Sequence, residues 1–110
     1  MPESMFPLTI GRIYVVYGIT TFRGHVRYYV LDDDQLPYPV WRLAPLFDLL
    51  DGRLPSSWRF GYFRLDSADV GVPIITFPEW ANDHYFYERL VDGDPDAVAT
   101  FAWRRTEAEG

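Results

Sequence analysis

The stretch from Leu36 to Trp58 holds four of the nine prolines and two of the four tryptophans of this chain. Proline fixes φ and lacks an amide hydrogen, so it is excluded from helix interiors and from central strands. Tyr38 and Ala44 each precede a proline, which pushes both residues toward extended geometry. We therefore predict a rigid connector that separates a strand-like half of the chain from the segments that follow.

One short segment inside this connector carries helical signals. Pro45 suits the first position of a helix, and Gly52 suits the position after its end. These signals predict a helix over 45–51. Its apolar face would hold Leu46, Leu49 and Leu50, with Phe47 beside them.

Segments rich in β-branched and aromatic residues predict four strands, over 12–19, 25–31, 58–65 and 70–77. The first two read as a hairpin whose loop contains Gly24, a residue that readily takes positive φ. Pro73 cannot donate to a strand ladder, so the fourth strand is expected at an edge of the sheet or to be irregular. Segment 66–69, which contains Asp66 and Asp69, is predicted to form the turn before the fourth strand.

Two helices are predicted after the strands. The first starts at Pro78 and runs to about Val91, and the second occupies 95–105 with Asp94 as its N-cap. The face of the first would hold Trp80, His84, Tyr87, Leu90 and Val91. The buried stripe of the second would hold Ala97, Val98, Phe101 and Ala102, with Trp103 off that stripe.

This order of elements predicts a fold of the α+β class. We expect one domain over residues 1–110, with a small mixed or antiparallel sheet of three to four strands. The two C-terminal helices would pack on that sheet. Residues 1–9 and 106–110 are expected to be loose tails.

The formal net charge of −6 excludes some classes of partner. Phosphate binding needs a basic face, so we expect no nucleic acid, and anionic membrane surfaces are disfavoured as well. The absence of cysteine excludes disulfides, thiolate nucleophiles and Cys-ligated zinc. No apolar run is long enough to span a membrane and the N-terminus lacks a signal sequence, so we expect a cytoplasmic protein without membrane contact.

The candidate metal sites in the sequence are weak. Asp32, Asp33 and Asp34 offer oxygen ligands, but they lack the spacing of a calcium loop and fit a solvated turn. His84 and Glu88 have the i, i+4 spacing of two ligands, but the only other histidine, His25, is distant in the sequence. We expect His84 to face the core and predict no metal and no cofactor.

No catalytic signature stands out either. The serines Ser4, Ser56, Ser57 and Ser67 show no nucleophile-elbow pattern, and neither glycine-rich phosphate motif is present. None of the 16 acidic residues stands in a context that identifies a catalytic carboxylate. An active site can still assemble from residues without a local motif. The alternative to a non-enzymatic role is thus a small-molecule-binding or enzymatic domain with a Tyr-lined pocket.

Aromatic residues make up 18% of the chain, which is its one unusual feature of composition. Tyr, Trp and Arg dominate the hot spots of protein interfaces, so the aromatic excess favours protein binding. The candidate contact residues are Trp41, Arg42, Trp103 and Arg104. The simpler interpretation of any one ring is that it belongs to the core.

The expected partner is a protein, either one whose basic charge the negative chain attracts or a second copy of this chain. In its small size, acidity, lack of cysteine and lack of a catalytic signature, the chain resembles bacterial immunity proteins, which neutralise partner toxins. The resemblance implies an immunity-like or regulatory role.

Overall fold

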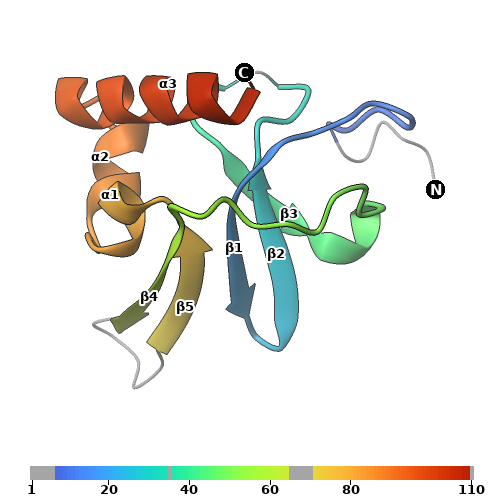
Figure 1. Cartoon of the computed structure of the whole chain (residues 1–110), viewed down its shortest axis with the longest axis horizontal. Helices are drawn as coiled ribbons and strands as arrows, with labels where there is room; N and C mark the ends of the chain where they lie inside the picture. Colours follow the sequence, from blue (N-terminus) through green and yellow to red (C-terminus); the bar gives the residue numbers. More distant parts are fainter. Residues whose placement is uncertain (1–6, 35, 65–70, 110) are drawn as a thin grey trace.

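The computed structural model describes residues 7–34, 36–64 and 71–109, in which five strands form one antiparallel sheet (Figure 1). The strands are β1 (Val16–Phe22), β2 (His25–Val30), β3 (Val40–Leu43), β4 (Arg59–Arg64) and β5 (Gly71–Thr76). They lie in the order β3-β2-β1-β5-β4. This confirms the predicted α+β class, although the sheet has five strands rather than three to four.

The predicted hairpin is formed by β1 and β2. Its turn is Arg23-Gly24, where both residues have positive φ, of 51° and 78°. A two-residue turn in which both residues have positive φ has a backbone twist that matches the twist of the flanking strands. Glycine takes positive φ readily, so Gly24 in the sequence predicted this turn. β1 begins at Val16 rather than at residue 12, and a bulge between Val16 and Gly18 places Tyr17 in the core.

β3 was not predicted as a strand, because prolines surround it. Val40–Leu43 pairs antiparallel with β2, so that Tyr29 lies opposite Trp41 and Arg27 lies opposite Leu43. Pro39 and Pro45 stand just outside this ladder. An edge strand tolerates prolines at its ends because their missing amide hydrogens interrupt no central ladder.

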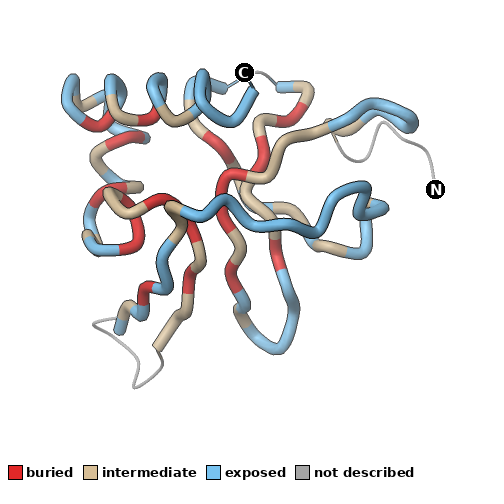
Figure 2. Tube along the Cα trace, in the orientation of Figure 1, coloured by how far each residue is buried: buried red, intermediate tan, exposed pale blue. Residues whose placement is uncertain are grey.

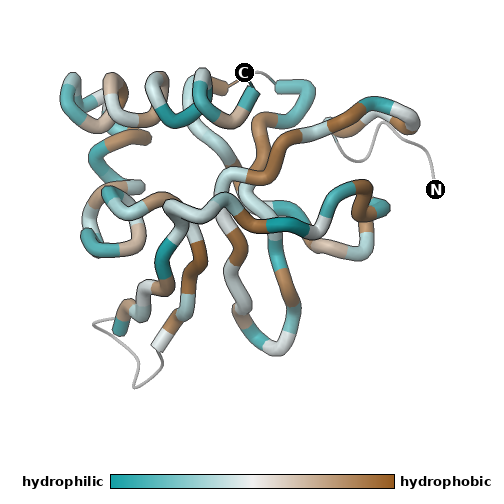
Figure 3. The backbone as a smooth tube through the Cα atoms, in the orientation of Figure 1, coloured by the Kyte–Doolittle hydropathy of each residue, from teal (hydrophilic) through white to brown (hydrophobic). Residues whose placement is uncertain are grey.

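The predicted helix over 45–51 is wrong. Only one 3₁₀ turn forms, η2 (Ala44–Leu46), and the backbone of Phe47 is extended, with φ −124° and ψ 148°. The Phe47 ring packs against Tyr14 and Tyr28, at centroid distances of 6.0 and 5.9 Å. This packing competes with a helical conformation of the segment. Leu46, Leu49 and Leu50 are exposed, and Figure 3 shows hydrophobic positions along this stretch.

β5 lies between β1 and β4, so of the two alternatives expected from Pro73, an edge strand or an irregular one, the edge position is wrong. β5 pairs with β4 from residue 71 to 76 but with β1 only from Ile74 to Thr76. Pro73 therefore lies just beyond the β1–β5 ladder, where the two strands diverge (Figure 1). Its carbonyl oxygen accepts a hydrogen bond from the Thr20 hydroxyl, at 2.6 Å.

The single helix predicted over 79–91 is two helices, α1 (Pro78–Ala81) and α2 (Phe86–Val91). The interruption centres on Asp83, whose carboxylate accepts hydrogen bonds from the Tyr85 amide at 2.9 Å and from Arg89 at 2.7 Å. A short acidic side chain that bonds the nearby backbone competes with helical hydrogen bonding. The helix therefore stops, turns and restarts.

The helical pattern predicted that His84 faces the core with Trp80 and Tyr87, and this prediction is wrong. Because residues 82–85 leave the helix, the imidazole stacks instead on Phe63 of β4, with centroids 5.1 Å apart and an interplanar angle of 6°. Phe86 takes the buried position, at 2% exposure.

α1 and α2 cover one face of the sheet, and α3 (Pro95–Glu109) crosses its end (Figure 1). Tyr29 of β2 contacts Trp80 and Tyr87, with centroid distances of 4.7 and 5.4 Å. The buried cluster between these layers consists of Tyr17, Ile74, Phe77, Trp80, Phe86, Leu90, Ala97 and Phe101 (Figure 2).

The two ends of the chain are held to the rest of the fold where the structure describes them. Residues 106–109, expected as a loose tail, continue α3 to Glu109, whose carboxylate accepts a hydrogen bond from the Tyr17 hydroxyl at 2.6 Å. Residues 7–9 of the expected tail 1–9 are tied down, because the Pro7 carbonyl accepts the Asp33 amide at 2.7 Å. In α3, Ala97 and Phe101 are buried as predicted, whereas Val98 and Ala102 are exposed. The predicted turn at 66–69 lies outside the described residues.

Candidate functional site

The strand register gathers arginine and aromatic side chains beside the helices. Arg27 and Tyr29 of β2 lie on one face of the sheet, and their partners Leu43 and Trp41 on β3 share that face. α1 and α2 cover Tyr29 but leave Trp41 46% exposed. We refer to Phe22, Arg23, Arg27 and Trp41 as the arginine–aromatic surface.

Arg27 is the centre of this surface. Its guanidinium carbon lies 4.4 Å from the centroid of the Trp41 ring and 5.4 Å from that of Phe22. Nη1 donates a hydrogen bond to the Phe22 carbonyl oxygen at 2.6 Å, and the residue is only 8% exposed. The exposed indole therefore rests on a cation that is itself held in place.

The surface is locally cationic on an acidic chain. Within the part of the chain that the structure describes, neither Arg23 nor Arg27 forms an ion pair, and Arg23 also lies against Phe22, at 5.3 Å. Nε of Arg27 is buried without a hydrogen-bond partner. Several other arginines do pair with a described carboxylate, among them Arg12, Arg42, Arg53, Arg89, Arg104 and Arg105.

Arg42, the predicted companion of Trp41, belongs to the other face of the sheet. Adjacent residues of a strand point to opposite faces. Its Nη2 lies 2.6 Å from Oδ2 of Asp32, a carboxylate that is 1% exposed. The structure thus separates these two candidates, and Arg27 takes the place beside Trp41.

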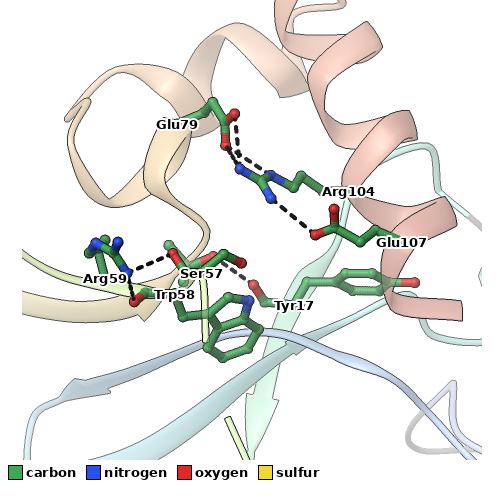
Figure 4. Close-up of polar contacts among 8 residues, drawn as sticks. Tyr17, Ser57, Trp58, Arg59, Glu79, Arg104 and Glu107 are labelled. Atoms are coloured by element: carbon green, nitrogen blue, oxygen red, sulfur yellow. Dashed lines mark hydrogen bonds and ion pairs between the residues drawn. The ribbon is translucent and has the colours of Figure 1, made fainter. Parts of the chain in front are cut away.

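Trp103 and Arg104 stay together on α3. Trp103 is 55% exposed, and the Arg104 guanidinium lies 4.3 Å from its ring centroid. Figure 4 shows the Arg104 side chain bonded to both carboxylate oxygens of Glu79, at 3.0 and 3.2 Å, and to Glu107 at 3.0 Å. No recorded contact between described residues joins this pair to Trp41.

The sequence alone did not single out Arg27 or Phe22. Arg27 reads as a polar position in a strand, and nothing in its own segment distinguishes it. Its proximity to Trp41 depends on pairing between β2 and β3, and the prolines concealed β3. Had residues 40–43 been recognised as a strand, the alternation of side chains would have placed Trp41 and Leu43 on one face. It would not have given the register with β2 that brings Trp41 close to Arg27.

The acidic run at 32–34 is a structural junction. Asp33 accepts hydrogen bonds from the Thr9 hydroxyl at 2.6 Å and the Tyr14 hydroxyl at 2.7 Å, and these bonds lower the pKa of its carboxyl group. Arg12 adds an ion pair at 2.8 Å. Over the described ranges, no three His, Cys, Asp or Glu side chains stand close enough to hold a metal ion, and no helix is long and apolar enough to cross a membrane.

Tyrosines gather where α2 meets the start of β3. The Tyr87 ring lies 5.4 Å from Tyr29 and 6.3 Å from Tyr38, and its hydroxyl donates to the Pro39 carbonyl at 2.7 Å. Burial raises the pKa of Tyr29 and Tyr87, and the charge of Arg27 partly opposes the rise at Tyr29. An open hollow of about 370 Å³ adjoins this cluster, lined by Tyr87, Glu88, Val91 and Asp92.

In comparisons with known proteins, no family model, curated protein or solved structure matches this chain. Its function must therefore be argued from the geometry and charges of these surfaces.

Proposed function

We propose that this chain is a cytoplasmic, non-enzymatic protein-binding domain that contacts its partner through Trp41. The observation that carries this proposal is that the Trp41 ring is 46% exposed yet lies 4.4 Å from a nearly buried guanidinium. A large ring that is already held loses little entropy on binding, and tryptophan is the residue type most enriched among interface hot spots. In this proposal the chain acts as an immunity-like or regulatory partner of a basic protein.

The charge of the chain supports a partner that is basic overall. Glu88 on α2 and Asp92, its C-cap, form no ion pair among the described residues, and the Tyr87 hydroxyl links α2 to Pro39, just before β3. Carboxylates without an ion pair attract a basic protein and orient its approach. Such attraction raises the association rate and weakens as salt rises.

The test uses the whole chain as bait in lysate of its source cells, followed by calorimetry with the protein that is captured. We expect Trp41→Ala to keep the circular dichroism spectrum of the parent and to lose ~2 kcal/mol or more of binding free energy, the size of a hot spot. Trp103→Ala is the matched control, because it removes another exposed tryptophan ring, from α3. A folded Trp41→Ala variant that binds as tightly as the parent refutes the assignment.

A second candidate function is small-molecule binding in the hollow beside Tyr87. Tyr87, Glu88, Val91 and Asp92 offer an aromatic ring, an apolar side chain and two carboxylates around a volume of about 370 Å³. Mixed apolar and polar linings are typical of ligand sites. Amide chemical-shift changes confined to α2 on titration with a compound panel, and lost in Val91→Arg, would favour this function over protein binding.

A further inference from the structure

We infer that the partner places a carboxylate against the guanidinium of Arg27, beside Trp41; this inference rests on the proposed function and names the group recognised. Arg27 is 8% exposed and has no carboxylate within ion-pair distance in the described ranges. Toward the described residues its side chain donates one hydrogen bond, from Nη1 to the Phe22 carbonyl. The positive charge is therefore nearly buried without a counter-ion in the part of the chain that the structure describes.

An unpaired buried cation is costly, because it loses hydration and gains no opposite charge. The rings of Trp41 and Phe22 offset part of that cost through cation–π attraction. A carboxylate delivered at the interface would offset more, since hydrogen bonds between ionised groups are stronger than those between neutral ones. The free protein thus holds a site that is completed by an anion.

Another arginine that lies over a tryptophan shows what a completed arrangement looks like. Arg104 lies 4.3 Å from Trp103, much as Arg27 lies 4.4 Å from Trp41, and its side chain is 11% exposed. However, Arg104 also bonds Glu79 and Glu107 (Figure 4). The carboxylate that completes the pair on α3 has no counterpart at Arg27.

The unused donors of Arg27 define how the anion would bind. Nε is buried without a partner, and Nη2 makes no hydrogen bond to a described residue. These two nitrogens share one edge of the planar guanidinium, and such an edge matches the two oxygens of a carboxylate. Of these two nitrogens, only Nε is fully buried without a partner. We therefore expect the carboxylate to approach Arg27 from the Nη2 side, and a shift of the Trp41 ring then exposes Nε.

The occupant is a single protein carboxylate rather than a polyanion. The local cations without ion pairs are Arg23 and Arg27, both against Phe22, whereas the chain as a whole carries a formal charge of −6. A nucleic acid would bring many phosphates to an acidic molecule, which is unfavourable. An Asp or Glu side chain or a C-terminal carboxylate brings one charge, which the surface can pair.

The experiment follows the ¹⁵N resonances of the Arg27 Nε–Hε group and the Trp41 indole during titration of the whole chain with sodium acetate. We expect saturable shifts of both signals, with no such shifts in sodium chloride of equal ionic strength. The Trp103 indole should not respond, because Arg104 is already paired. Two peptides then distinguish the sources: one carries an internal Asp and blocked ends, and the other has only a free C-terminal carboxylate. The peptide with the lower Kd identifies the source.

Arg27→Lys is the conservative variant, because it keeps the charge but removes the two-nitrogen edge. We expect it to weaken acetate binding about tenfold, the effect of one charge-assisted hydrogen bond. Trp41→Phe provides a second folded variant, in which the Nε–Hε shift should persist. Equal responses to acetate and chloride, an unchanged acetate response in Arg27→Lys, or saturation by sodium phosphate at lower concentration than by acetate would each overturn the inference. The titration needs no partner, so it can fail or succeed independently of the pull-down that tests protein binding.

Discussion

Arg42 and Asp32 form a close ion pair on the sheet face opposite Trp41, with 2.6 Å between Nη2 and Oδ2. The carboxylate is 1% exposed and the guanidinium 28% exposed. The Asp32 carboxylate also accepts the Asp34 amide at 3.0 Å, which closes the turn after β2. Arg42 therefore neutralises a buried charge between β3 and that turn.

Arg42→Ala should destabilise the protein strongly, because it leaves the Asp32 carboxylate buried without its cation. Breaking a buried ion pair in this way costs about 3 kcal/mol. Arg53→Ala is the matched control, since the Arg53–Asp51 pair has side chains 89% and 56% exposed and should contribute little to stability. Urea denaturation measures both values, and equal losses for the two variants would contradict the structural role of Arg42.

Gly61→Ala should disturb the contact between β4 and α1. A Cβ atom at Gly61 would stand 2.3 Å from the carbonyl oxygen of Ala81, a backbone atom that cannot move aside alone. We expect a loss of about 2 kcal/mol, typical of overpacking. At Gly52 an added Cβ meets only the mobile tip of Leu49, at 3.3 Å, so Gly52→Ala should cost much less. Thermal unfolding followed by circular dichroism compares the two.

Alkaline pH should destabilise the fold through its buried tyrosines. Burial is the main cause that raises the pKa of Tyr17, Tyr29 and Tyr87 above the ordinary value of 10.0. Their contribution to stability is fully present below pH 10 and is lost as the pH rises further, because the unfolded chain ionises first. Phenolate absorbance and ellipticity should then change together above pH 10. Ionisation of all tyrosines without loss of ellipticity would contradict this.

The tryptophans should separate into core and surface groups. Trp80 is 2% exposed and contacts Tyr29, Phe77 and Phe86, so Trp80→Ala should cost about 4 kcal/mol of stability. Trp41→Ala should cost about 1 kcal/mol, in the range of ordinary substitutions away from a core. Equilibrium denaturation tests this difference. Global unfolding of Trp41→Ala would mean that its ring is structural rather than a free anchor.

Local signals in the sequence determined the class of the fold and several of its elements. The β1–β2 hairpin follows from β-branched and aromatic residues around a turn at Gly24. The start of α3 follows from Asp94, whose carboxylate accepts the Ala97 amide at 3.1 Å, as expected of an N-cap. The exposure of Trp103 follows from its place off the Ala97–Phe101 stripe. Each of these features depends on residues within a few positions of one another, so the sequence pattern was sufficient.

Only the tertiary structure decided where the remaining segments lie and which residues meet. Phe47 is extended rather than helical, and its ring packs against Tyr14 and Tyr28. β5 lies inside the sheet despite Pro73, because β1 pairs with it only from Ile74 to Thr76. The candidate site arises in the same way, since Arg27 meets Trp41 only through pairing between β2 and β3. Contacts between distant residues depend on register and packing, which outweigh propensities of a kcal/mol or less per residue and leave no local pattern in the sequence.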